Sequence, residues 1–140
     1  MLFRSDSGIE VDALQGRPGI YSARYAGTGA SDEENLHKLV NEVARLPQDQ
    51  RGCRFVCLMV YLRHAEDPIP LIAQGLWEGL AITEPRGANG FGYDPMFYLP
   101  DRRCTSAELA PEIKNELSHR GQALRLLVAQ LQGIYPAHDA

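Results

Sequence analysis

The sequence predicts an α/β fold with a mixed, twisted sheet flanked by helices. Residues 9–14 alternate apolar and polar side chains, as a half-buried strand does. Residues 55–62 are apolar on both alternating faces, which is typical of a central strand covered on both sides. Apolar residues spaced i, i+3, i+4, i+7 recur over 36–43 and 124–131, so two amphipathic helices are expected there.

Length and composition indicate one ordinary globular domain. The chain has 140 residues, of which 44% are hydrophobic and 23% charged, so it can bury a core of its own. We expect a single domain over residues 1–140, with residues 132–140, including His138, as a loose polar tail. The net charge of -4 indicates no general affinity for nucleic acid.

The sequence favours a cytoplasmic protein without a membrane partner. It has no apolar run of membrane-spanning length and no signal-peptide stretch near its first residues. Of its three cysteines, Cys53 and Cys57 lie four apart in an expected strand, which separates them by about 13 Å. That distance is too long for a disulfide, so reduced core cysteines in a reducing compartment are expected.

The first half of the chain is expected to form strands around one helix. Asp6 precedes the first strand beside a glycine turn, where its carboxylate could face a cleft or bond its own backbone. Ser31 or Asp32 is expected to cap a helix that ends before Pro47. Another strand is expected over residues 71–82, with a bulge or bend at its glycines.

The last third is expected to contain a short strand and two helices. The strand covers residues 96–99, and the first helix covers residues 111–117. Ser118 suits the N-cap of the second helix, whose core face would be Leu124, Leu127, Val128 and Leu131. A cation in the first turn of that helix, Arg120, is unfavourable for the helix alone, and an anion- or carbonyl-binding site would explain it.

Residues 87–95 form the most distinctive stretch. Three glycines lie within six positions, two of them on either side of Phe91, and Tyr93, Asp94 and Pro95 follow. Glycine allows a ligand to approach the main chain, and the aromatic rings offer flat surfaces for a planar ligand such as a nucleobase. An ordinary turn between strands favours the same residue types, so composition alone leaves both interpretations open.

The order of the motifs makes the nucleotide interpretation more specific. Gly-Phe-Gly-Tyr-Asp-Pro over residues 90–95, with Asp6-Ser7-Gly8 before it and Ser118-His119-Arg120-Gly121 after it, resembles the inosine triphosphate pyrophosphatase family. The resemblance covers residues 6–131. It implies a two-lobed fold, a homodimer, and a house-cleaning hydrolase that cleaves ITP, dITP and XTP to the monophosphate and pyrophosphate with Mg²⁺ as cofactor.

The resemblance also implies roles for individual residues. Asp6 would be the catalytic residue and metal ligand, holding Mg²⁺ or taking a proton from the attacking water. Hydrogen-bond donors around the nucleobase, from Lys114, His119, Arg120 and backbone N–H groups, would satisfy the C6 oxygen of hypoxanthine or xanthine. The C6 amine of adenine is itself a donor, so these groups would oppose it. The expected substrate-binding residues are Ser7, Phe91, Gly92, Tyr93, Asp94, Lys114, Ser118, His119 and Arg120.

Two features of the sequence favour an alternative. Family members begin with a further strand and a Thr/Ser-Gly-Asn…Lys phosphate loop, and they carry a second acid where this chain has Ser5. We therefore expect an N-terminally truncated member, and a catalytically inactive nucleotide-binding fragment is the alternative function. The sequence has no Gly-x-Ser-x-Gly elbow and no Walker-type loop, which argues against a serine hydrolase and a P-loop ATPase.

Overall fold

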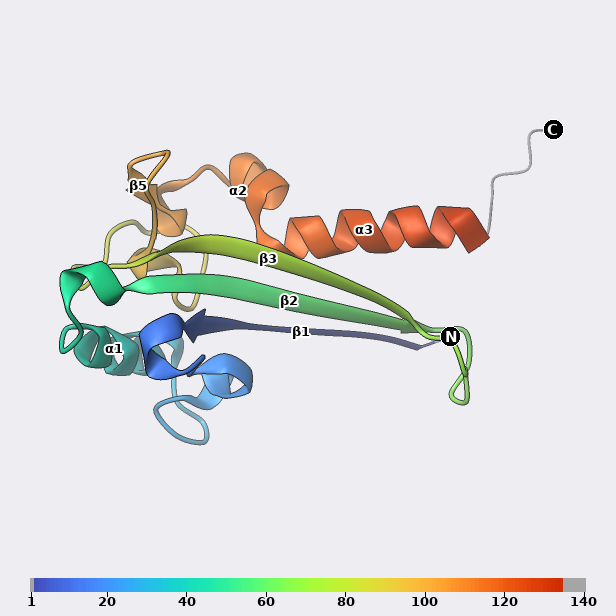
Figure 1. Cartoon of the computed structure of the whole chain (residues 1–140), viewed down its shortest axis with the longest axis horizontal. Helices are drawn as coiled ribbons and strands as arrows, with labels where there is room; N and C mark the ends of the chain where they lie inside the picture. Colours follow the sequence, from blue (N-terminus) through green and yellow to red (C-terminus); the bar gives the residue numbers. More distant parts are fainter. Residues whose placement is uncertain (1, 135–140) are drawn as a thin grey trace.

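The computed structural model of the chain describes residues 2–134, which fold around a five-stranded sheet (Figure 1). The strand order is β1-β2-β3-β4-β5, and neighbouring strands pair antiparallel throughout. The α/β class is confirmed, whereas the expected mixture of parallel and antiparallel strands is not present among the described residues. The strands are β1 (Leu2–Val11), β2 (Gly52–Leu62), β3 (Leu71–Ala81), β4 (Phe97–Leu99) and β5 (Cys104–Thr105).

The described residues form three α-helices: α1 (Asp32–Val43), α2 (Pro111–Leu117) and α3 (His119–Ile134). α1 and α3 pack on the sheet, and α2 packs on α3. Ser31 caps α1 as predicted, because its hydroxyl accepts from the Glu34 N–H while the Glu34 carboxylate accepts from the Ser31 N–H. None of the described helices is long and apolar enough to cross a bilayer. The short 3₁₀ turns are η1 (Asp12–Leu14), η2 (Gly19–Arg24), η3 (Gln48–Gln50), η4 (Asp94–Met96) and η5 (Ser106–Glu108).

One face of the sheet carries the core, which divides into two clusters. The larger cluster joins the β1, β2 and β3 residues near the β4 end to the apolar stripe of α1, with Phe55 and Phe97 at its centre. The smaller cluster lies towards the β2–β3 hairpin tip and packs Ala123 and Leu127 of α3 on the sheet. Figure 1 shows the two helices that cover these clusters, with α1 at one end of the long hairpin and α3 running along the other.

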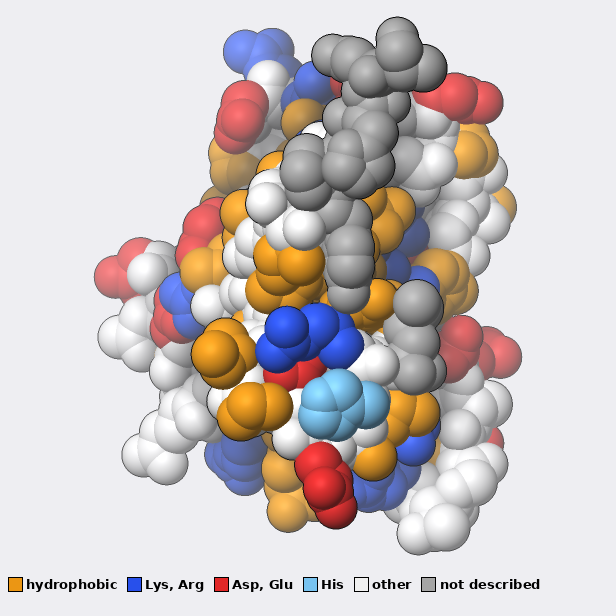
Figure 2. Space-filling model, turned by 90° about the vertical axis from the view of Figure 1, so that its right-hand side faces the viewer, with side chains coloured by type: hydrophobic (Ala, Val, Ile, Leu, Met, Phe, Trp, Pro, Cys, Tyr) orange, Lys and Arg blue, Asp and Glu red, His pale blue; other side chains and the backbone are white. Residues whose placement is uncertain are grey.

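The opposite face of the long hairpin is open. Leu58, Ile72, Leu76 and Leu80 are exposed there, so the prediction that residues 55–62 are covered on both sides is wrong for the described structure. Figure 2 views the molecule from the hairpin end and shows apolar side chains among charged ones of both signs. No single sign of charge dominates the part of that view that described residues occupy.

The first strand is longer than predicted and starts earlier. β1 begins at Leu2, so Asp6, Ser7 and Gly8 lie in its middle, and the prediction that Asp6 is at a strand end is wrong. β1 ends at Val11, where the chain turns into η1, because Asp12–Leu14 bond locally and not across the sheet. The polar residues Arg4 to Ser7 hid the strand signal, since an edge strand tolerates polar side chains on both faces.

The glycines of β3 allow close packing and do not form a bulge. β3 stays in continuous register with β2 from Leu71 to Leu80, so the predicted bulge is absent from this pairing. A Cβ atom on Gly75 would lie 1.9 Å from the carbonyl oxygen of His119. Gly75 therefore lets the first turn of α3 rest directly on the sheet, and this contact positions the residues that follow Ser118.

The buried side of α3 differs from the predicted one. Ala123 and Leu127 are buried, whereas Leu124 and Val128 are exposed, so half of the expected core face is wrong. The close contact at Gly75 decides the orientation, because it brings the His119 and Ala123 side of the helix onto the sheet. Residues 132–134, expected as part of a loose tail, belong to α3, and residues 135–140 with His138 lie outside the described residues.

Candidate active site

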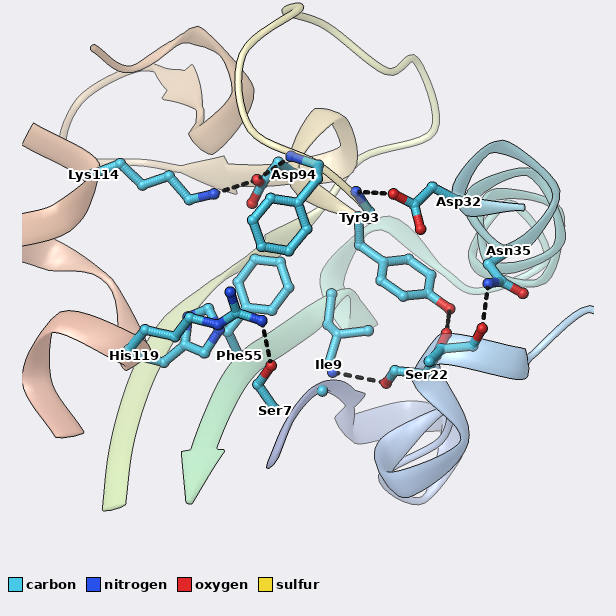
Figure 3. A pocket seen from close by; sticks show the side chains of 15 residues that line it. Ser7, Ile9, Ser22, Asp32, Asn35, Phe55, Tyr93, Asp94, Lys114 and His119 are labelled. Carbon is cyan, nitrogen blue, oxygen red and sulfur yellow. Dashed lines mark hydrogen bonds and ion pairs between the residues drawn. The ribbon is translucent and has the colours of Figure 1, made fainter. Parts of the chain in front are cut away.

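A cavity of about 160 Å³ lies where β1, α1, α3 and the 87–95 loop meet (Figure 3). Most of the predicted binding residues line it: Ser7, Phe91, Gly92, Tyr93, Asp94, Lys114, His119 and Arg120. These residues come from four separated segments of the sequence, so the fold brings the three predicted motifs together. We refer to this cavity as the base pocket, because its dimensions and lining suit a flat, polar-edged ligand.

The floor of the base pocket is aromatic and apolar. Ile9 and Phe55 come from the buried face of the sheet, and the His119 ring stacks on Phe55 with a centroid separation of 4.8 Å. The Tyr93 ring is buried against the core, and its hydroxyl donates to the carbonyl oxygen of Ser22 at 2.6 Å. Burial raises the pKa of Tyr93, so this phenol stays protonated and serves as a donor.

Asp94 holds the 87–95 loop in place, and its carboxylate oxygens already accept hydrogen bonds from the protein. Its buried carboxylate accepts from the Phe91 N–H at 2.9 Å, from the Ser106 hydroxyl at 2.7 Å and from the Lys114 ammonium at 2.5 Å. The pair with Lys114 links the loop to α2. Lys114 therefore has two functions in this geometry: it neutralises a buried acid and it presents a cation at the pocket wall.

Phe91 is the exposed aromatic ring of the loop, and two cations lie against it. The Lys114 ammonium is 4.7 Å from the ring centroid, and the Arg120 guanidinium is 4.9 Å away. Arg120 also donates to the Ser7 hydroxyl at 3.1 Å and so reaches from α3 to β1. Ser7 thus positions Arg120, which is a more specific role than the ligand contact that the resemblance implied.

His119 is a neutral imidazole with an unused polar atom. Its Nδ1 is buried and has no hydrogen-bond partner among the described residues. Burial, followed by the positive charge of Arg120, lowers the pKa of His119 to about 4. A neutral ring can donate from one nitrogen and accept at the other, so His119 can meet either kind of group on a ligand edge.

Ser118, between α2 and α3, is the one predicted binding residue that does not line the base pocket. Its hydroxyl accepts from the Gly121 N–H at 3.1 Å, which confirms it as the N-cap of α3. Ser118 instead lines a wider cavity of about 650 Å³ on the other side of Phe91. Phe91, Lys114, His119 and Arg120 border both cavities, so they form a wall between them.

Asp6 faces away from the base pocket. Alternation along β1 places Asp6 and Glu10 on the open face of the sheet, whereas Ser7 and Ile9 face the core. Asp6 lines a separate cavity of about 170 Å³, together with Gly8, Ile20 and Gln74. Ser7 and Gly8 line this cavity and the base pocket, so the two cavities meet at the edge strand.

The described side chains around Asp6 do not form a metal site by themselves. Among residues 2–134, no group of three or more His, Cys, Asp and Glu side chains could hold a metal ion. Glu10 is committed to Arg54, whose guanidinium lies 3.4 Å from its carboxylate. Residue Asp6 is exposed, and Mg²⁺ binds with one or two carboxylates plus substrate phosphates, so this single carboxylate fits a metal ion whose other ligands come from a phosphorylated ligand.

Sequence reasoning missed several pocket residues, among them Asp32 and Asn35. Asp32 was considered only as a possible cap, yet its carboxylate accepts from the Gly92 N–H at 3.2 Å. Asn35 is buried, donates to the Ala23 carbonyl oxygen and accepts from the Ala26 N–H. In the sequence, Asn35 could have been recognised only as a polar residue on the apolar side of the helix that is α1.

An antiparallel sheet with helices on one face, and a pocket lined by aromatic and cationic side chains at its edge, define the class of this protein as α/β with a small pocket at the sheet edge. The chain belongs to the Ham1 family, whose model matches residues 1–130. The match confirms the family that the three motifs indicated.

Curated relatives and solved structures agree with this assignment. The dITP/XTP pyrophosphatase of Vibrio cholerae is 55% identical over 127 residues, which are 91% of this chain and 64% of that protein. The dITP/XTP pyrophosphatase of Thioalkalivibrio sulfidiphilus is 58% identical over 128 residues, which are 91% of this chain and 65% of that protein. A HAM1 protein from Coxiella burnetii superposes with a TM-score of 0.87 at 45% identity, covering 94% of this chain and 66% of that one. The chain therefore spans slightly less than two thirds of the length of these relatives.

Proposed function

We propose that this chain carries the catalytic and base-binding face of a nucleoside triphosphate pyrophosphatase that acts on the deaminated purine nucleotides ITP, dITP and XTP. The observation that supports this most is the meeting of two cavities at Ser7 and Gly8. One cavity offers aromatic and donor groups for a base, and the other offers Asp6 for the phosphate end. A nucleotide lying across the edge of β1 would reach both.

The base pocket suits a keto purine. Arg120, Lys114 and the neutral His119 line it from the α2–α3 side, and each can donate a hydrogen bond. A C6 oxygen accepts such bonds, whereas the C6 amine of adenine would meet donors with a donor. Unpaired donors in a buried site oppose binding strongly, and such sites can reject the wrong group by up to about 10⁴-fold.

The proposed reaction is attack of water on the α-phosphorus. The bond from the α-phosphorus to the α–β bridging oxygen breaks, pyrophosphate leaves, and the nucleoside monophosphate remains. Mg²⁺, when bound with the phosphates, would neutralise their charge and lower the pKa of a bound water. Asp6 would hold the metal and orient the water, since Mg²⁺ is bound by one or two carboxylates together with substrate phosphates.

Pyrophosphate release tests this proposal. The purified chain is incubated with ITP, XTP, GTP and ATP, with and without Mg²⁺, and the monophosphate and pyrophosphate are quantified. We expect Mg²⁺-dependent release from ITP and XTP and at least about 100-fold less from ATP. Release of orthophosphate in place of pyrophosphate, or equal turnover of ATP, would contradict the assignment.

The second candidate is a nucleotide-binding chain without turnover. The separation of Asp6 from the base pocket by the thickness of the edge strand favours it, because the two sites cooperate only if the nucleotide spans that edge. Nucleotide binding without pyrophosphate release would support this candidate. Measuring nucleotide binding and pyrophosphate release on the same preparation therefore distinguishes the two candidate functions.

Cytoplasmic residence and a homodimer complete the proposal. Cys53, Cys57 and Cys104 are free thiols, which suits a reducing compartment. The exposed leucines and isoleucine on the open sheet face form the kind of apolar surface that a second subunit covers. Size measurement in solution with and without reductant would test both expectations.

A further inference from the structure

Two hydrogen bonds cross the mouth of the base pocket, and they differ in burial. The Tyr93 hydroxyl donates to the Ser22 carbonyl oxygen at 2.6 Å within the core. The Gly92 N–H donates to the Asp32 carboxylate at 3.2 Å on the exposed rim. Both bonds tie the 87–95 loop to the segment formed by η2 and α1, as Figure 3 shows.

The rim bond holds the loop beside its exposed ring. Gly92 adopts φ 59°, in the left-handed region, directly after Phe91. The Phe91 side chain is 57% exposed, and no close aromatic partner among the described residues fixes it. The Phe91 ring is therefore positioned by its backbone, which Asp94 holds on one side and Asp32 on the other, and by the cations of α2 and α3 that lie against it.

Asp32 is itself anchored. It is the first residue of α1, directly after the N-cap Ser31. One turn later, buried Asn35 ties the same helix to the backbone of Ala23 and Ala26 at 3.0 and 2.8 Å. The Asp32 carboxylate thus projects from a fixed helix end to the loop across the pocket.

We propose that Asp32 is a positioning residue that holds the aromatic loop, through the Gly92 N–H, in the conformation that stacks a nucleobase on Phe91. The inference deepens the proposed function and rests on it. Asp32 lies on the base side of the edge strand and Asp6 on the other. Loss of Asp32 should therefore weaken nucleotide binding while leaving the chemical step unchanged.

Three variants test this role. Asp32→Ala removes the acceptor, Asp32→Asn keeps an acceptor oxygen without the charge, and Glu33→Ala removes the neighbouring exposed acid in the same helical turn. Initial rates with ITP separate KM from kcat for each variant. Loss of one hydrogen bond predicts a rise in KM of about 3–10-fold for Asp32→Ala, with kcat within about 2-fold of wild type. Asp32→Asn should recover most of the affinity, and Glu33→Ala should match wild type.

A binding measurement keeps the test independent of turnover. Trp77 is the single tryptophan, and its ring centroid lies 6.4 Å from that of His119, so its fluorescence can report occupation of the pocket by inosine monophosphate. We expect the same order of Kd: wild type, Glu33→Ala and Asp32→Asn close together, and Asp32→Ala weaker. A wild-type KM and Kd in Asp32→Ala, or an Asp32→Asn variant as weak as Asp32→Ala, would overturn the positioning role. Absence of turnover in every variant, with this order of Kd intact, would contradict the proposed function and leave the role of Asp32 supported.

Discussion

Asp6 and Ser7 are adjacent in β1, and their side chains lie on opposite faces of the sheet. Ser7 pairs with Cys57 on the covered face and accepts from Arg120, whereas Asp6 pairs with Leu58 on the open face. The edge strand therefore divides two tasks between neighbouring residues. The proposed base recognition lies on one side and the proposed phosphate chemistry on the other.

This division predicts opposite kinetic effects for the two residues. Asp6→Asn keeps size but removes the negative charge that attracts Mg²⁺, so kcat should fall by about 100-fold or more while the affinity for inosine monophosphate stays unchanged. Ser7→Ala removes the Arg120 partner, so KM should rise with little change in kcat. Steady-state kinetics with ITP and Mg²⁺ would measure both. Retention of the wild-type rate by Asp6→Asn at saturating Mg²⁺ would make Asp6 a structural residue.

The two cations at Phe91 should respond differently to truncation. Arg120 is exposed, so Arg120→Ala should lower ITP affinity by about 10-fold and leave the melting temperature nearly unchanged. Lys114→Ala should lower affinity and stability together, because it leaves the buried Asp94 carboxylate without its cation, at a cost of about 3–5 kcal/mol. Melting curves beside ITP titrations would distinguish the two. Equal stability of both variants would mean that the Asp94–Lys114 pair contributes little.

The depressed pKa of His119 predicts a pH dependence of stability. In the unfolded chain a histidine has a pKa of about 6.5, whereas burial and Arg120 hold that of His119 at about 4. Between these values the unfolded state binds more protons, so stability is fully present above about pH 6.5 and is lost as pH falls towards 4. The loss approaches roughly 3 kcal/mol. Urea unfolding at pH 7 and pH 4.5 should show a smaller pH effect for His119→Asn than for wild type.

The open sheet face predicts self-association of the 140-residue chain. Leu58 and Leu76 are 40% and 45% exposed near the middle of that face, and exposed apolar patches promote contact between copies. Leu58→Thr with Leu76→Thr introduces polar, β-branched residues that suit strands, and it should shift the chain towards monomer in sedimentation velocity. Ile69→Thr, at an equally apolar but isolated position in the hairpin loop, is the control. Equal association of all three proteins would place the contact elsewhere.

Sequence reasoning identified the residues of the base pocket better than their orientations. Phe91, Lys114, His119 and Arg120 were among the expected binding residues, and all four line the base pocket, because ordered motifs identify residues that lie at one site. The side on which Asp6 lies depends on the start of β1, and the polar run from Arg4 to Ser7 obscured that start. Local pattern carries no information about how far an edge strand extends.

The same limit applies to α3 and to Tyr93. The spacing of Leu124, Leu127, Val128 and Leu131 predicted a helix correctly but not the side that is buried, because Gly75 on a different strand sets the helix orientation. Tyr93 looked like a stacking ring in the sequence, yet its hydroxyl bonds to Ser22, 71 residues away. Long-range contacts of this kind decide which polar or aromatic side chain meets a ligand.

The division of the core into two clusters has a dynamic consequence. The smaller cluster includes Met59, Tyr61 and Leu127, and the opposite face of the hairpin at this end is exposed to solvent. We expect this half of the hairpin and the end of α3 to open as one cooperative unit, with amide hydrogens that exchange before those around Phe55 and Phe97. His119 and Gly75 lie at the boundary between the halves. The binding residues would then stay ordered while the far end of the molecule fluctuates.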